Sequence, residues 1–364
     1  MKKKILHLIT GLEIGGAETM LLEVMPRLDQ FQHIICSLST IGPSGKKLID
    51  AGFTVYALKS GKIFSPAAIY RFGRIIFREK PDLIATRLIH ADIFGRIFGK
   101  IFGVHKILCC LESVLDQPKY QKFFLLEQVT SFLVNQYVAV SQAVKDAYLS
   151  KTKIIPSKIT VIYNGIDLHK FKPTVNKTAA KKNTGLDDYQ PIIGYVAKMR
   201  PERNHRLLIE AFANIQKTYP TALLVLAGDG PARPDLEKLA ANLNIKNQIK
   251  FLGNRHDIPN ILSCLDIFVS PSAYEGMSVS ILEAMACGVP VIASDIAPNR
   301  EIIENKKNGI LIPSLQAPII AEEISSLLSN GALLQSISLN SITIAQKFSI
   351  DTTAHCLTEL YLSL

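Results

Sequence analysis

The sequence lacks any CxxC pair, although it contains six cysteines in 364 residues. Most of them lie inside apolar runs; they are Cys36, Cys109, Cys110, Cys264, Cys287 and Cys356. This pattern argues against a zinc site and a disulfide framework, and it favours buried, small apolar side chains in a reducing compartment. The sequence also lacks a low-complexity tract and is 48% hydrophobic, which excludes disorder as the dominant state.

No segment combines the features of a signal peptide, and the one membrane-like apolar run contains helix breakers. Residues 1–10 hold three lysines and a short apolar run without a small-residue cleavage site, which indicates a first strand. The longest apolar stretch, 277–294, contains Gly288 and Pro290, so a helix followed by a buried strand is the better interpretation. We therefore expect a cytoplasmic protein.

The length of the chain predicts two domains, because single hydrophobic cores stop growing at about 250–300 residues. Short β-branched runs alternate with amphipathic helical patterns, which is typical of parallel sheets with helical crossovers. A polar, lysine-rich stretch over 170–190 separates two series of strands and is expected to be a linker. The predicted strands are 4–9, 33–38, 54–58, 83–86, 106–110 and 137–140, then 192–196, 222–227, 249–252, 267–270, 291–293 and 310–312.

These patterns predict an α/β protein with two doubly wound, Rossmann-like domains that face each other across a cleft. The first covers residues 1–169 and the second covers 170–364. Ligands of such sheets bind at the carboxyl ends of the strands. A final helix over 353–364 has apolar residues at helical spacing and needs an apolar surface. Our hypothesis is that it packs back on the first domain.

The net charge of +10 comes from basic residues in the first half of the chain. Such a field attracts lipid head groups, nucleic acid or phosphorylated substrates without choosing among them. Arg71, Arg74 and Arg78 share one face of a predicted helix, and Arg96 and Lys100 repeat the pattern in the next. One hypothesis is that one of these helices binds an anionic membrane face; crossover helices buried on one side are the alternative. Nucleic acid is not expected, because no recognised nucleic-acid module accompanies the charge.

Two carboxylates flank a glycine turn at the end of one predicted strand. Glu275 falls in the loop, and Glu283 falls within the following helix among apolar residues. Between them, Gly276 permits close backbone approach, and the amides of Met277 and Ser278 would face an anion from a helix N-terminus. The pattern suits a nucleotide diphosphate. From the residues alone, a purely structural interpretation fits equally well. Glu283 would then be a salt-bridged core residue, and Glu275 would be a carboxylate at the start of the helix.

A cluster of cations follows another predicted strand and comprises Lys198, Arg200, Arg203 and Arg206. Cations at the carboxyl end of a strand can clamp a leaving diphosphate and stabilise its developing charge. For Arg200 and Arg206, a solvated loop is the preferred interpretation.

The passage 272–288 resembles the E-x7-E motif of the large family of retaining GT-B glycosyltransferases numbered four. The resemblance implies that Glu275 contacts the hydroxyls of the donor sugar and that Glu283 holds the ribose hydroxyls of the nucleotide. It also implies that Lys198 and Arg203 bind the diphosphate. The family places an Arg first and a Lys five positions later, so their order is reversed here, which changes the phosphate contacts because only Arg offers a planar fork.

Glycine turns in both halves extend the similarity. Gly228 and Gly230 follow a strand of the second half, and we interpret them as letting the backbone approach the nucleotide. Gly15 and Gly16 open a helix after the first strand, where a phosphate site or an ordinary tight turn is possible from the residues alone. The resemblance implies that this loop lines the cleft near the donor phosphates.

The acceptor side is less well defined by the sequence. Many family members carry a cleft histidine after the fifth strand, but Glu112 lies in the corresponding stretch here. His90, after the fourth strand, is the nearest substitute. A lone histidine beside Asp92 is more often a satisfied hydrogen-bond partner than a catalyst, so His90 and Glu112 are acceptor-side candidates only.

The resemblance implies retaining transfer of a sugar from a nucleoside diphosphate sugar, a UDP-sugar in our interpretation. The acceptor is expected to be a glycan or a lipid-linked sugar in cell-surface polysaccharide or glycolipid synthesis, on the inner face of the membrane. No metal or other cofactor is expected, because the sequence has no DxD pair and the cations would neutralise the diphosphate. A nucleotide-sugar epimerase, a non-catalytic sugar-nucleotide-binding protein and a Rossmann oxidoreductase remain open, although the last lacks GxGxxG.

Overall fold

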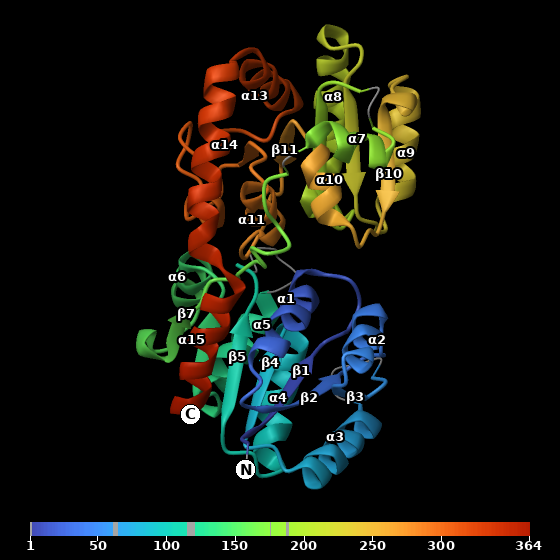
Figure 1. Cartoon of the computed structure of the whole chain (residues 1–364). Coiled ribbons are helices and arrows are strands. Elements are labelled where there is room, and N and C mark those ends of the chain that lie inside the picture. Colours follow the sequence, from blue (N-terminus) through green and yellow to red (C-terminus); the bar gives the residue numbers. More distant parts are fainter. Residues whose placement is uncertain (1, 61–64, 115–120, 175, 187–188) are drawn as a thin grey trace. The chain divides into compact units, whose positions relative to one another are not determined.

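The computed structural model describes residues 2–60, 65–114, 121–174, 176–186 and 189–364 (Figure 1). The chain forms two compact units. Unit 1 consists of Met1–Gly165 and Ile350–Leu364, and unit 2 consists of Ile166–Ser349. Each unit contains one parallel sheet with helical crossovers, which confirms the predicted fold class.

Unit 1 is built on a seven-stranded sheet with the order β3-β2-β1-β4-β5-β6-β7. Its strands are β1 (Lys4–Ile9), β2 (Gln32–Ser37), β3 (Thr54–Ala57), β4 (Leu83–Arg87), β5 (Ile107–Leu111), β6 (Gln136–Ala139) and β7 (Ile159–Val161). Its helices are α1 (Gly16–Val24), α2 (Pro43–Asp50), α3 (Pro66–Glu79), α4 (Ile89–Ile101), α5 (Gln121–Thr130), α6 (Gln142–Lys151) and α15 (Ile350–Ser363). The central strands are buried on both faces, which explains their nearly continuous apolar sequences.

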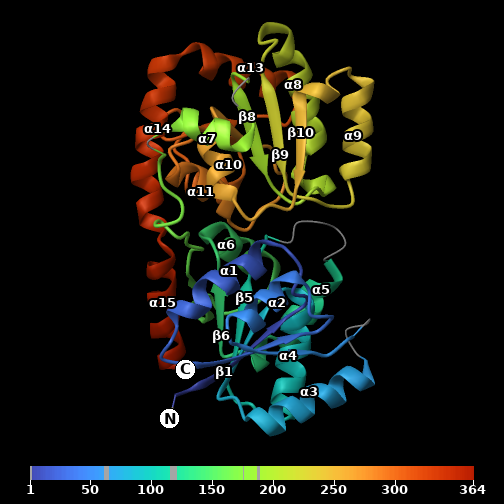
Figure 2. The same cartoon turned by 45° about the vertical axis from the view of Figure 1, so that its right-hand side comes forward.

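Unit 2 is built on a six-stranded sheet with the order β10-β9-β8-β11-β12-β13. Its strands are β8 (Ile192–Val196), β9 (Leu223–Ala227), β10 (Ile249–Gly253), β11 (Ile267–Ser270), β12 (Val291–Ser294) and β13 (Ile310–Ile312). Its helices are α7 (Lys177–Thr184), α8 (His205–Thr218), α9 (Arg233–Asn242), α10 (Ile258–Cys264), α11 (Val279–Ala286), α12 (Ala297–Arg300), α13 (Ala317–Ser329) and α14 (Gly331–Ala345). Figure 2 shows α8 and α9 beside each other on this unit.

The last helix, α15, is part of unit 1 although it follows unit 2 in the sequence. It packs against α1 (Figure 2). Its buried side includes Leu357 and Tyr361. The Thr353 hydroxyl donates a hydrogen bond of 2.9 Å to the carbonyl of Tyr163. Cys356 points to solvent, so the expectation of buried cysteines is wrong for this residue, whereas the other five are buried.

A buried polar network ties α4 and α5 to the sheet of unit 1. The guanidinium of Arg96, which is fully buried, donates hydrogen bonds of 2.6 and 2.8 Å to the two carboxylate oxygens of Glu127. The Tyr137 hydroxyl donates a third bond, of 2.8 Å, to Glu127. Arg96 is therefore a structural residue, and the hypothesis that the cations of α4 face a membrane is wrong for this arginine.

Candidate functional site

The two clusters that the sequence singles out in unit 2 lie at one edge of its sheet. Lys198 and Arg203 follow β8, and Glu275 follows β11. These strands are parallel neighbours, with Ile267 paired to Ile193, so their carboxyl ends meet at the same edge.

An ion pair joins the two loops. Nη1 of Arg203 donates a hydrogen bond to Oε1 of Glu275 and lies 3.3 Å from the hydroxyl of Ser272. Only 7% of the Glu275 side chain is exposed, and a carboxylate so buried is strongly destabilising without a partner. Arg203 thus compensates the buried charge of Glu275 and fixes its position.

Hydrogen bonds from neighbouring residues reinforce this junction. The hydroxyls of Tyr195 and Ser272 lie 2.7 Å apart, and the backbone amide of Ala273 donates to the carbonyl of Glu202. Asn204 has a left-handed backbone with φ of 52°, which asparagine tolerates, and its amide donates to the carbonyl of Pro271. Sequence reasoning missed these residues. Their only local signal is an asparagine immediately before a helix.

His205 adds a neutral ring beneath the junction. It is buried at the start of α8, and its ring centroid lies 4.7 Å from that of Tyr195. Burial, together with the charge of Arg203, lowers the pKa of His205 to about 4. The ring is therefore uncharged at neutral pH and adds no positive charge to this edge.

Lys198 differs from Arg203 in its surroundings. Its side chain is half-buried, and among the described residues its ammonium has no ion-pair or hydrogen-bond partner. A partly desolvated cation without a partner favours an anionic ligand. Lys198 is therefore a cation at this edge that is free to bind one.

The segment after Glu275 leads into α11 as the sequence predicts. Gly276, Met277 and Ser278 are buried, and the Ser278 side chain makes no capping hydrogen bond to the helix. Glu283 lies in the second turn of α11 and is half-buried. The segment places a helix N-terminus and a second carboxylate after the ion pair, which is an arrangement that can bind an anion and hydroxyl groups.

Gly228 and Gly230 lie against the backbone of the β8 loop. A Cβ on Gly228, whose φ is +124°, would lie 2.1 Å from the carbonyl oxygen of Ala197, and one on Gly230 would lie 2.3 Å from that of Met199. The backbone that approaches these glycines is therefore that of the β8 loop. They hold the loop that carries Lys198 against β9.

The candidates in unit 1 lie in three separate settings. Gly15 is the N-cap residue of α1. A Cβ on Gly15 would lie 2.5 Å from the Glu18 carboxylate, whereas a Cβ on Gly16 would be in open space. The Glu112 carboxylate forms an ion pair of 2.5 Å with the buried Arg87. The His90 ring packs edge-on against Phe123, and burial lowers its pKa. Glu112 thus already has a structural partner.

Among the described residues, no group of three or more His, Cys, Asp or Glu side chains is placed to hold a metal ion. In the same part of the chain, no helix has both the length and the apolar character that crossing a bilayer requires.

Two family models divide the chain between them. The model of Glycosyltransferase Family 4 matches residues 14–170, and the model of Glycosyl transferases group 1 matches residues 176–343. A curated relative from Escherichia coli, UDP-Gal:alpha-D-GlcNAc-diphosphoundecaprenol alpha-1,3-galactosyltransferase, is 30% identical over 328 residues, which cover 85% of this chain and 84% of the relative. The chain is a glycosyltransferase of the family 4 type.

One further relative and two solved structures are similar to this chain. The putative glycosyltransferase EpsF of Bacillus subtilis is 28% identical to this glycosyltransferase over 81% of the chain and 79% of the relative. The crystal structure of Anabaena Alr3699/HepE in complex with UDP and glucose has a TM-score of 0.88 and 24% identity, and the similarity covers 100% of both chains. A glycosyltransferase structure from Rickettsia africae has a TM-score of 0.82 and 24% identity, with coverage of 99% and 98%. These structures show that the glycosyltransferase has the GT-B fold.

Proposed function

We propose that this glycosyltransferase transfers a sugar from a UDP-sugar to a lipid-linked acceptor, with retention at the anomeric carbon. The observation that carries the proposal is the ion pair between Arg203 and Glu275, which unites the two predicted clusters at the carboxyl edge of the unit 2 sheet. The printed name of the Escherichia coli relative includes both UDP-Gal and a diphosphoundecaprenol acceptor, and a structure of the Anabaena protein contains UDP-glucose. The comparisons do not favour an epimerase or a non-catalytic binding protein.

In the proposed site, each residue of unit 2 has a distinct role. Glu275 accepts hydrogen bonds from the hydroxyls of the donor sugar, and Glu283 accepts them from the ribose. Lys198 and the amides at the start of α11 neutralise the diphosphate as the bond to the sugar breaks, which stabilises the leaving group where charge develops. Arg203 pairs with Glu275 and holds it in place, so it acts as a positioning residue. On this proposal no metal is required, and EDTA should leave turnover unchanged.

The role of Glu275 is tested by Glu275→Gln, which keeps the shape but removes the charge. Release of UDP in the presence of acceptor should fall about 10- to 150-fold, the range expected for loss of hydrogen bonds to a charged group. Glu202→Gln, in the neighbouring loop, is the matched control, because Glu202 contributes its carbonyl rather than its carboxylate to the junction. Equal turnover of the two variants would contradict the assignment.

Two measurements separate the proposal from its alternatives. A transferase releases UDP only when an acceptor is present, whereas an epimerase changes the donor without an acceptor and a binding protein does neither. NMR of the product should show that the new glycosidic bond has the anomeric configuration of the donor. An inverted product would rule out retention while leaving the transfer reaction itself intact.

A further inference from the structure

The solvent-facing side of α3 combines arginines with large aromatic side chains. Tyr70, Arg71, Arg74, Phe77 and Arg78 are all exposed and recur at intervals of three and four residues, so they form one stripe along the helix. Tyr70 is 66% exposed and Phe77 is 82% exposed. We call these five residues the α3 stripe. It contains no acidic residue.

The fold of unit 1 does not require the aromatic residues of this stripe. The opposite side of α3 buries Ala68, Phe72, Ile75 and Ile76 and so supplies the contacts with the core. An exposed Phe or Tyr is unremarkable singly, but two of them interleaved with three arginines on one face are typical of a helix that binds at a membrane interface.

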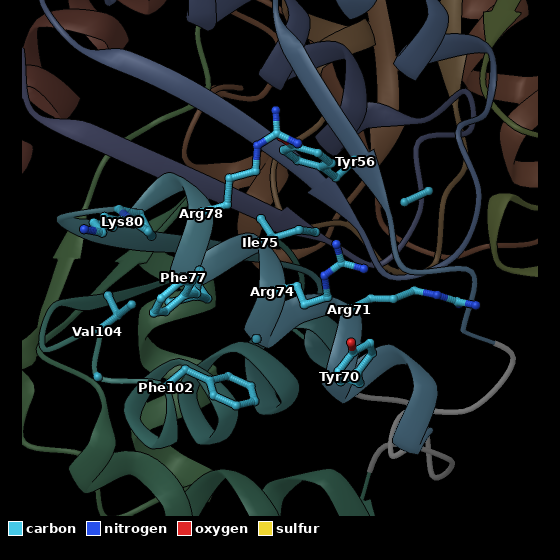
Figure 3. Close-up of a pocket in the computed structure, with 15 residues that line it drawn as sticks. Tyr56, Tyr70, Arg71, Arg74, Ile75, Phe77, Arg78, Lys80, Phe102 and Val104 are labelled. Carbon is cyan, nitrogen blue, oxygen red and sulfur yellow. The ribbon is translucent and has the colours of Figure 1, made fainter.

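A groove of about 940 Å³ adjoins the stripe (Figure 3). Tyr70, Arg71, Arg74, Phe77 and Arg78 contribute to its wall, and Phe102 and Val104 line it from the segment after α4. Gly73 lets the Phe102 ring pack closely against α3, because a Cβ there would lie 2.8 Å from that ring. The groove therefore offers apolar rings and cationic groups to the same ligand.

The positive charge of this surface is only partly balanced. Glu79 accepts a hydrogen bond of 2.6 Å from Tyr56 and lies 3.5 Å from Arg78. Arg71 donates to the carbonyl of Leu58, and Arg74 lies 6.0 Å from the centre of the Tyr70 ring. Two of the three arginines of the stripe thus have neutral partners, which leaves a net charge complementary to an anion.

The neighbouring helix with similar sequence does not provide such a surface. In α4, Arg96 is buried against Glu127, and the Lys100 ammonium donates to the carbonyl of His105. The structure therefore distinguishes α3 from α4, which their sequences alone do not.

We infer that the α3 stripe and its groove are a docking surface for an anionic lipid bilayer. Arg71, Arg74 and Arg78 bind the phosphates of the head groups, while Phe77 and Tyr70 enter the interfacial layer. The inference deepens the proposed function, because a lipid-linked acceptor lies in such a bilayer. It rests on unit 1 alone and is tested without donor or acceptor.

The test is sedimentation of the full-length protein with phosphatidylcholine vesicles, with and without phosphatidylglycerol. The wild type should sediment only with the anionic vesicles, and added salt should release it. Arg74→Glu/Arg78→Glu should weaken this partitioning at least about 25-fold, since each cation near an anionic surface contributes about fivefold. The matched control is Lys217→Glu/Lys238→Glu, which changes two exposed cations of unit 2 and should bind like the wild type.

The aromatic part of the surface has its own control. Phe77→Ser should weaken vesicle binding, whereas Phe132→Ser, which alters another phenylalanine that is 74% exposed, should not. The thermal shift produced by UDP should be unchanged in all four variants. If the wild type does not bind UDP, the proposed function is wrong. The docking surface is then still tested by the vesicle data alone.

Three results would overturn the inference. These are equal sedimentation with neutral and anionic vesicles, no sedimentation with either, and equal binding by Arg74→Glu/Arg78→Glu and its control. Binding of an oligonucleotide that Arg74→Glu/Arg78→Glu abolishes, without any binding to vesicles, would assign the surface to nucleic acid instead.

Discussion

Arg203 and Lys198 are five positions apart in one loop but have different electrostatic surroundings. Arg203 compensates a buried carboxylate, whereas the Lys198 ammonium has no partner among the described residues. A cation that balances a buried charge contributes to stability, and one that awaits a ligand does not. The two residues should therefore separate stability from donor binding.

Arg203→Ala and Lys198→Ala form a pair of tests of this difference. Arg203→Ala leaves Glu275 buried without its partner and should lower the free energy of unfolding by about 2 kcal/mol, since Arg203 itself is partly exposed. Lys198→Ala should leave the melting temperature within about 1 °C of the wild type but weaken UDP binding about tenfold. Thermal denaturation measures the stability of each variant, and calorimetric titration with UDP measures its affinity for the nucleotide. A destabilised Lys198→Ala protein with normal UDP affinity would contradict the assignment.

The sequence alone indicated candidate charged residues but not how they pair. Glu275, Lys198 and Arg203 could be picked out because charges at strand ends are informative in an α/β protein. The pairing of Arg203 with Glu275 could not be, because it depends on how the loops after β8 and β11 pack. The same holds for Glu112, whose ion pair with Arg87 joins the ends of two other strands.

At the scale of elements, the close fit between the β8 loop and β9 depends on Gly228. Gly228→Ala would introduce a Cβ into the carbonyl of Ala197 at a φ of +124°, and we expect it to destabilise the protein by about 2–3 kcal/mol. Gly331→Ala, at the start of α14, meets open space and should be neutral or stabilise by up to about 1 kcal/mol. Chemical denaturation of the two variants measures the difference. Equal stability would show that the loop moves freely away from β9.

The buried network of unit 1 gives its stability a pH dependence. Burial raises the pKa of Asp92 to about 8, and its carboxyl accepts a bond of 2.6 Å from Thr86. The folded pKa exceeds that of the unfolded chain, so the folded state holds the proton more tightly, and this stabilisation is lost as the pH rises from about 4 to 8. Asp92→Asn keeps the acceptor but cannot ionise. The stability of the wild type relative to this variant should therefore fall by up to about 1.4 kcal/mol per pH unit.

Urea denaturation of both proteins between pH 5 and pH 8 measures this difference, and the buried histidines cancel because both proteins contain them. Parallel curves of stability against pH would show that Asp92 is already ionised in the folded protein.

The strands were predictable because a strand buried on both faces has an apolar, β-branched sequence. All twelve predicted strands are present with shifts of one residue at most at either end, and β1, β8, β11 and β13 match in full. The seventh strand of unit 1, Ile159–Val161, lies at the edge of the sheet and was missed. Helix α7 was missed because its sequence is polar, so the stretch expected to be a linker contains a helix capped by Asn176.

At the scale of the whole molecule, the chain crosses twice between its units, near Gly165 and near Ser349. Sequence analysis could place the first crossing, because a polar stretch follows it. It could only suggest the second crossing. The apolar side of α15 indicates that the helix is buried but does not identify the surface that it packs against. The structure supplies that surface in α1 and in the strands of unit 1.

This arrangement predicts that damage to the C-terminal helix weakens unit 1 rather than the unit that precedes it in sequence. Leu357→Ala removes a side chain that is 3% exposed and should destabilise unit 1 by about 2–5 kcal/mol. Leu362→Ala, in the same helix at 56% exposure, is the control and should change little. UDP distinguishes the unfolding of unit 1 from that of unit 2. The proposed donor groups lie in unit 2, and a bound ligand stabilises only the part that binds it. Calorimetric scans of Leu357→Ala should show an early transition that UDP does not move, followed by one that UDP raises. An early transition that shifts with UDP would mean that α15 couples unit 1 to the donor site.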